Sequence, residues 1–90
     1  MTSRHHQARL ESRTDASAVY TFTPDSTKQC VWGRVRFNLA DYSHEILELA
    51  HDCQESSDRQ SLACSALAHK LRCAHSVEPS TVPSTLEFVA

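Results

Sequence analysis

The side chains best able to do chemistry are the histidines and cysteines between residues 44 and 75. His69 and Cys73 are four residues apart, which would place an imidazole and a thiol on one face of a helix as two ligands for a metal. His44 and His51 are seven apart and would also share a helical face. The chain has four cysteines but no Cys-x-x-Cys pair, so neither set matches the close spacing of a structural zinc site. We therefore predict no bound metal and no other cofactor.

Catalytic groups are harder to assemble from this sequence. Asp52 and His51 precede Cys53, but adjacent residues of a helix point in different directions, so His51 cannot serve Cys53 as a base. Phosphate-binding loops need several glycines, and Gly33 is the only glycine of the chain. The sequence therefore predicts a protein that is not an enzyme.

Aromatic and basic side chains share one face of a predicted strand. Trp32, Arg34 and Arg36 alternate with other residues there, and such a face can stack a base and hold phosphates. However, the formal net charge is −2 and the pI is near 6.3, which gives no general attraction to nucleic acids or anionic membranes. A nucleic-acid-binding module using these three residues is therefore an alternative function.

Two helices are expected to position most of these side chains. The first is predicted over residues 38–53, where Asn38 is a good N-cap and apolar residues recur at steps of three and four. The opposite face is acidic and carries Glu45, Glu48 and Asp52. We interpret this face as solvated, or as a docking surface for a basic partner.

The second helix is predicted from Ser57 to about His75, because Ser57 and Gln60 fit a capping box. It has two apolar stripes rather than one. The first stripe can pack on the preceding helix. The second is displaced around the helix axis and needs either the strands below or another chain to cover it. We therefore predict a partner-binding surface made of Leu62, Ala66, His69 and Cys73.

Two segments alternate between the two faces of a strand, residues 18–23 and residues 29–37, with turn-forming residues between them. They predict an antiparallel β-hairpin, which would need the helices to cover one of its faces. The preceding residues 1–17 are polar and resemble a flexible arm. The last residues are apolar enough for a short strand that adds to the hairpin edge, in this molecule or another, with a frayed terminus as the alternative.

Ninety residues allow one domain. The expected organisation is a flexible arm (1–17), a small α+β domain (18–76) and an extended tail (77–90). Within the domain, an N-terminal β-hairpin packs on an antiparallel two-helix hairpin. The sequence has no run of eighteen apolar residues and no apolar N-terminal segment, so we expect neither a transmembrane helix nor a secretory signal. Free thiols in the cytoplasm are then the expected state of the cysteines.

Such a small core supplies little stability, so a partner is a common supplement. We therefore predict a small protein-binding regulator, a stoichiometric inhibitor or anti-activator that covers a partner's interface with its helical pair. The partner would be another protein, and the chain could also pair with itself as a homodimer. A self-assembling structural unit is a further alternative.

Overall fold

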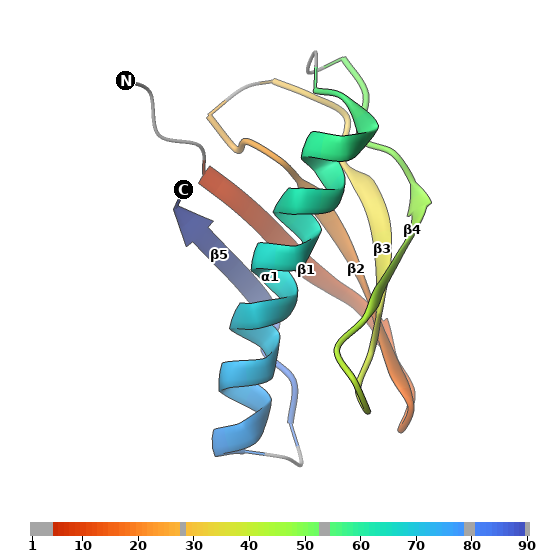
Figure 1. The fold of residues 1–90 in the computed structure, drawn as a ribbon, viewed down its shortest axis with the longest axis vertical. Helices are drawn as coiled ribbons and strands as arrows, with labels where there is room; N and C mark the ends of the chain where they lie inside the picture. Colours follow the sequence, from red (N-terminus) through yellow and green to blue (C-terminus); the bar gives the residue numbers. More distant parts are fainter. Residues whose placement is uncertain (1–4, 28, 53–54, 79–80, 90) are drawn as a thin grey trace.

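The computed structural model describes residues 5–27, 29–52, 55–78 and 81–89. The strands are β1 (His5–Arg13), β2 (Ser17–Thr23), β3 (Gly33–Asn38), β4 (His44–Glu48) and β5 (Thr85–Val89), and the helix is α1 (Ser57–Val77). The strands form one antiparallel sheet in the order β4-β3-β2-β1-β5. α1 crosses one face of the sheet, and β4 and β5 are its two edges (Figure 1).

The predicted fold, a β-hairpin on a two-helix hairpin, is therefore wrong. The predicted pairing of the first two hydrophobic segments is confirmed, since β2 and β3 pair antiparallel from Ser17 with Asn38 to Phe22 with Gly33. The segments predicted as arm and tail, however, contain β1 and β5, which pair with each other. The described residues contain a single helix, so the term helical hairpin does not apply.

The first predicted helix is replaced by the end of β3, a turn and β4. Asn38 does bond to nearby backbone as expected of a cap, but its Oδ1 accepts from Ala40 N at 2.8 Å within a turn. Tyr42 then has a φ of 58°, a left-handed conformation that a continuing α-helix does not tolerate. In β4, Ile46 lies opposite Val35. The spacing that indicated a helix is therefore satisfied by pairing with β3.

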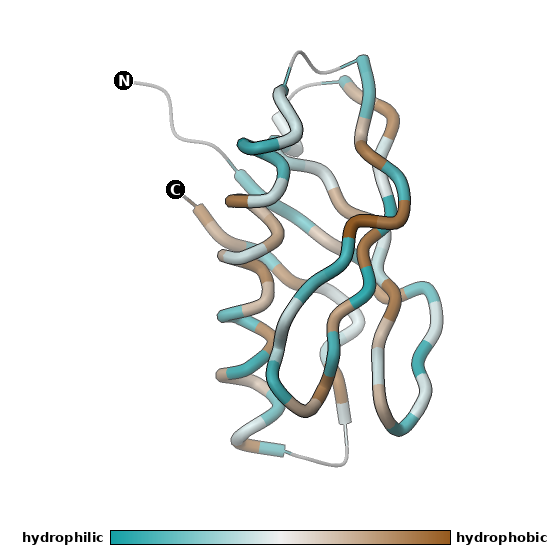
Figure 2. Tube along the Cα trace, turned by 45° about the vertical axis from the view of Figure 1, so that its right-hand side comes forward, coloured by the Kyte–Doolittle hydropathy of each residue, from teal (hydrophilic) through white to brown (hydrophobic). Residues whose placement is uncertain are grey.

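The second predicted helix is confirmed as α1, with small differences at its ends. Its N-cap is Ser56 rather than Ser57, and the Ser56 side chain accepts from Arg59 N. Hydrophobic and hydrophilic residues alternate along it with the helical turns (Figure 2). The side that faces the sheet is buried: Ala63, Cys64, Leu67, Ala68 and Leu71.

The core lies between α1 and the inner face of the sheet. Paired residues of neighbouring strands share a face, so the register places the largest buried sheet side chains together. Tyr20 and Phe37 meet edge to face, with ring centroids 5.6 Å apart. The buried sheet residues are Ala8, Ala18, Tyr20, Phe22, Val35, Phe37 and Leu86. In the part of the chain that is described, no helix is long and apolar enough to cross a membrane.

Candidate functional site

The free edge of β5 is the first candidate surface. Its pairing with β1 runs without a bulge from Thr85 to Val89. Next to it, Leu10 N donates to Ser84 O at 2.8 Å. Because hydrogen bonds alternate between the two sides of an antiparallel strand, every second residue of β5 directs its N–H and C=O away from β1. The residues that present these groups at the free edge are Thr85, Glu87 and Val89.

Side chains on both faces hold β5 in place. On the inner face, the Phe88 ring stacks on His6 with centroids 6.1 Å apart, and Lys70 Nζ lies 5.7 Å from the ring centroid. On the outer face, Glu87 accepts a hydrogen bond from Gln7 at 3.4 Å. These contacts order the strand, and among the described residues no strand pairs with its outer edge. An ordered edge without a bulge is a template for pairing with another chain.

The opposite edge, β4, is built differently. Val35 pairs with Ile46 but Arg34 pairs with Glu48, so Leu47 is an extra residue in β4. Such a bulge bends the strand and disrupts the regular row of backbone groups. Natural sheets use bulges of this kind to prevent pairing with other chains. The two edges therefore differ, and β5 is the one suited to an added strand.

The predicted partner-binding residues of α1 lie together on the side of the helix away from the sheet. Leu62 is 70% exposed, His69 and Cys73 are exposed, and Ala66 is half-buried. Cys73 Sγ lies 3.7 Å from His69 Nε2. The four residues therefore share one face of α1, as their spacing in the sequence predicts.

The acidic residues predicted to bind a partner do not join that surface. Glu45 and Glu48 belong to β4, and Asp52 lies in the loop after it with a φ of 64°. Glu45 forms an ion pair with Arg36. The helix expected to display these carboxylates is absent, because the segment pairs with β3 instead. Cys53, which was expected on the same helix, lies outside the described residues.

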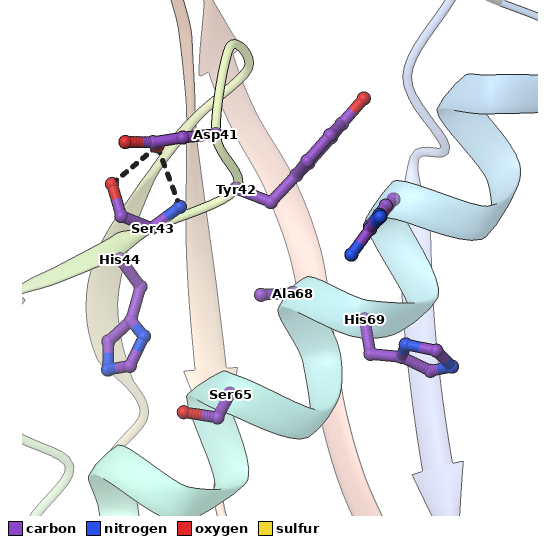
Figure 3. Close-up of a pocket in the computed structure, with 8 residues that line it drawn as sticks. Asp41, Tyr42, Ser43, His44, Ser65, Ala68 and His69 are labelled. Carbon is purple, nitrogen blue, oxygen red and sulfur yellow. Dashed lines mark hydrogen bonds between the residues drawn. The ribbon is translucent and has the colours of Figure 1, made fainter.

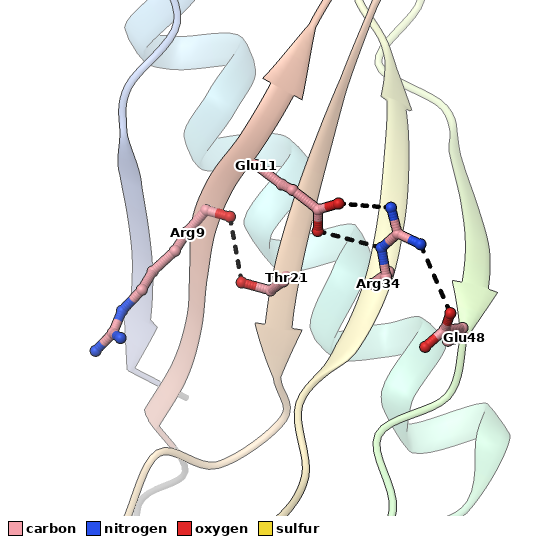
Figure 4. Close-up of polar contacts among 5 residues, drawn as sticks. All are labelled: Arg9, Glu11, Thr21, Arg34 and Glu48. Carbon is pink, nitrogen blue, oxygen red and sulfur yellow. Dashed lines mark hydrogen bonds and ion pairs between the residues drawn. The ribbon is translucent and has the colours of Figure 1, made fainter.

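The outer face of the sheet carries an ionic network around Arg34 (Figure 4). Its Nε and Nη2 donate to the two oxygens of Glu11 at 3.1 and 2.5 Å, and Nη1 lies 3.6 Å from Glu48 Oε1. The hydrogen bonds to Glu11, and then the negative charge of Glu11, raise the pKa of Arg34 above its ordinary value. Arg34 is therefore engaged by carboxylates on two other strands.

The other residues of the predicted nucleic-acid-binding face are also engaged. Arg36 pairs with Glu45, and the Arg9 guanidinium lies 4.8 Å from the centroid of the Trp32 ring. Phosphates would have to compete with these glutamates for the arginines, and a base would have to displace Arg9 from the indole. The arginine side chains do alternate onto one face of the sheet, but Arg34 and Arg36 are paired there with glutamates of the same sheet.

A cleft of about 350 Å³ lies between α1 and the turn that joins β3 to β4 (Figure 3). Hydroxyl–imidazole contacts cross from the β4 side to α1: Tyr42 Oη lies 2.7 Å from His75 Nδ1, and His44 Nε2 lies 3.1 Å from Ser61 Oγ. At the rim, hydrogen bonds from the backbone and side chain of Ser43 lower the pKa of Asp41. These contacts attach the turn to the helix.

Burial perturbs two titratable side chains of the core, Tyr20 and Cys64. Burial raises the pKa of Tyr20 to about 12, and the Tyr20 hydroxyl donates to Pro83 O at 2.6 Å. Burial also raises the pKa of the Cys64 thiol to about 12, so it is protonated near neutral pH. His44 and His51, expected on one helical face, lie in β4 and in a bridge to Val31. Within the described ranges, no three or more His, Cys, Asp or Glu side chains are grouped to hold a metal.

Sequence reasoning missed β1, and with it the edge that β5 forms. On the inner face of β1, His6 and Ala8 are buried and only Leu10 is a large apolar residue, so the alternation of this strand is weak. The only signal for β5 was its short apolar stretch, which could equally have paired with a second molecule. No protein-family model, curated protein or solved structure matches the chain.

Proposed function

We propose that this chain is a non-enzymatic, protein-binding regulator that takes an extended segment of its partner as an added strand beside β5. The observation that carries the proposal is the unbroken edge of β5, where Thr85, Glu87 and Val89 direct their backbone groups outward. Main-chain hydrogen bonds supply affinity in strand addition, and alternate side chains supply specificity. By sequestering such a segment, the chain would act stoichiometrically as an inhibitor or anti-activator.

The two faces beside the edge suggest which segment fits. On the inner face, Phe88 and the stem of Lys70 offer an apolar surface to every second residue of the partner strand. On the outer face, Glu87 offers a carboxylate, and Val89 is 63% exposed. The preferred segment therefore alternates apolar residues with polar ones and has a lysine or arginine on the side that meets Glu87.

The proposal includes a cytoplasmic location. Its support is the state of the thiols in the described part of the chain, where Cys30, Cys64 and Cys73 are free. Proteins of oxidising compartments commonly pair their cysteines, whereas cytoplasmic proteins keep them reduced.

Panning a displayed library of random peptides against the immobilised chain tests strand addition. The expected binders have the alternating pattern described above, and they should shift the backbone amide resonances of β5. Glu87→Pro should abolish this binding, because it removes an outward N–H and places a ring at the edge. The fold should tolerate that change, since the Glu87 N–H does not face β1.

The matched control is Glu87→Ala, which removes the carboxylate but keeps the backbone donor. It should retain most of the binding. If the library yields no enriched peptide, or if the selected peptides bind Glu87→Pro as well as they bind the wild type, strand addition at β5 is refuted.

A further inference from the structure

We propose that His69 and Cys73 are half of a zinc site that a second copy of the chain completes with the same two residues. The pair is exposed on the side of α1 that faces away from the sheet. It is therefore open to a metal ion and to another helix. This inference is independent of the β5 edge, which lies on a different element.

The separation of the two donor atoms suits a shared metal. Zinc binds imidazole nitrogen at about 2.0–2.1 Å and thiolate sulfur at about 2.3 Å, so a tetrahedral angle places the two ligand atoms about 3.6 Å apart. The observed distance between His69 Nε2 and Cys73 Sγ is 3.7 Å. The two side chains are four residues apart on one helix, so they lie one turn apart on the same face. A zinc ion could bind both atoms with little rearrangement.

One chain supplies only two of the four ligands that a structural zinc site requires. In the described residues, no further His, Cys, Asp or Glu side chain joins the pair to make a group of three. A second copy related by a two-fold axis would bring an identical imidazole and thiol, giving two nitrogens and two sulfurs. A second copy would thus supply the two ligands that a single chain lacks, which makes it the occupant expected on this face.

The neighbouring residues of the same face favour close approach. Ala66 is small and half-buried, one turn before Lys70, so it leaves room for a facing helix. Leu62 is exposed on the same side and would be covered by the second copy. Binding changes no oxidation state: each Cys73 thiol loses its proton to solvent and donates an electron pair to zinc.

Titration of the metal-free full chain with Zn²⁺, in a phosphine reductant that prevents disulfide-linked dimers, tests the site. The expected result is one Zn²⁺ per two chains and a doubling of the molar mass by light scattering, reversed by a chelator. Co²⁺ in place of zinc should give the intense absorption of a tetrahedral site and thiolate-to-cobalt charge transfer.

Variants assign the ligands. His69→Ala and Cys73→Ser should each lose the metal-dependent dimer while keeping the circular dichroism spectrum, because both positions are exposed. Cys30→Ser and His51→Ala are matched controls at positions outside α1 and should behave as the wild type. Glu87→Pro should leave zinc binding unchanged, and His69→Ala should leave peptide binding unchanged, so the two proposals fail separately.

Three results would overturn the proposal. They are a monomer that binds one Zn²⁺ per chain, a dimer that survives the chelator, and equal zinc binding by Cys73→Ser and Cys30→Ser. Absence of saturable zinc binding by the wild type would overturn it as well.

Discussion

Gln60 joins the start of α1 to the segment that follows β4, and its replacement by methionine should strongly destabilise the fold. The side chain is 2% exposed. Its Oε1 accepts from Ala50 N at 2.8 Å, and its Nε2 donates to Ala50 O at 2.8 Å and to Glu55 O at 3.2 Å. Methionine has a similar volume, so Gln60→Met removes the hydrogen bonds without opening a large cavity.

The expected loss of stability follows from the buried backbone groups that Gln60→Met leaves without a hydrogen-bond partner. Ala50 is 4% exposed, so its N–H and C=O would lose their partner with little access to water. A buried backbone group without a partner costs about 1–3 kcal/mol, which gives a loss of about 2–6 kcal/mol for the two. A chain of this length has a free energy of unfolding of roughly 5–13 kcal/mol. A loss near 3 kcal/mol would lower Tm by roughly 12–24 °C.

Urea unfolding followed by circular dichroism and by Trp32 fluorescence measures this loss. The control is Leu62→Met, a change at an exposed position of the same helix, which should alter the free energy of unfolding by less than about 0.5 kcal/mol. If Gln60→Met lowers the free energy of unfolding by less than about 1 kcal/mol with an unchanged m-value, the proposed anchoring role of Gln60 is wrong.

Three further predictions follow from the fold. Gly33→Ala should lower the free energy of unfolding by about 1–3 kcal/mol, because the added Cβ would lie 2.6 Å from Ala50 N and 2.8 Å from Phe22 Cε1. Unchanged stability in urea unfolding would contradict this packing. Burial raises the pKa of Cys64 and of Tyr20 to about 12, so the unfolded chain ionises first and stability should fall as pH rises from about 9 to 12. In Cys64→Ala the stability should begin to fall nearer pH 10. If this variant and the wild type lose stability over the same pH range, the Cys64 thiol does not contribute to the pH dependence. Filter binding with single-stranded DNA and RNA at low salt should show no retention, because glutamates pair with the arginines of the strand face. Saturable binding would restore nucleic-acid binding as the alternative function.

Local patterns in the sequence were enough to identify α1 and the pairing of β2 with β3. A capping residue, a 3.6-residue period and a short turn between two alternating segments are all properties of neighbouring residues. For the same reason, the sequence correctly placed Leu62, Ala66, His69 and Cys73 on one surface. Their relation depends only on helical geometry, which is the same in any tertiary context.

Residues 38–53 show where local reasoning failed. Apolar residues at steps of three and four favour a helix, but Glu45 and Glu48 find their arginines on β3 rather than within the segment. Ile46 likewise packs beside Val35 of the neighbouring strand. Strand pairing joins residues that are distant in the chain, so nothing in a short window reveals it, and tertiary contacts override a local preference.

The candidate sites show the same difference between what local sequence determines and what long-range pairing determines. The sequence by itself determined which residues of α1 share a face, including the imidazole and thiol that we assign to zinc, because the period of a helix is local. Only the tertiary structure decided that this face points to solvent, that the acidic residues belong to β4, and that β5 pairs with β1 and leaves its other side open. The order of strands in a sheet depends on pairings across the whole chain, which burial of one common core selects.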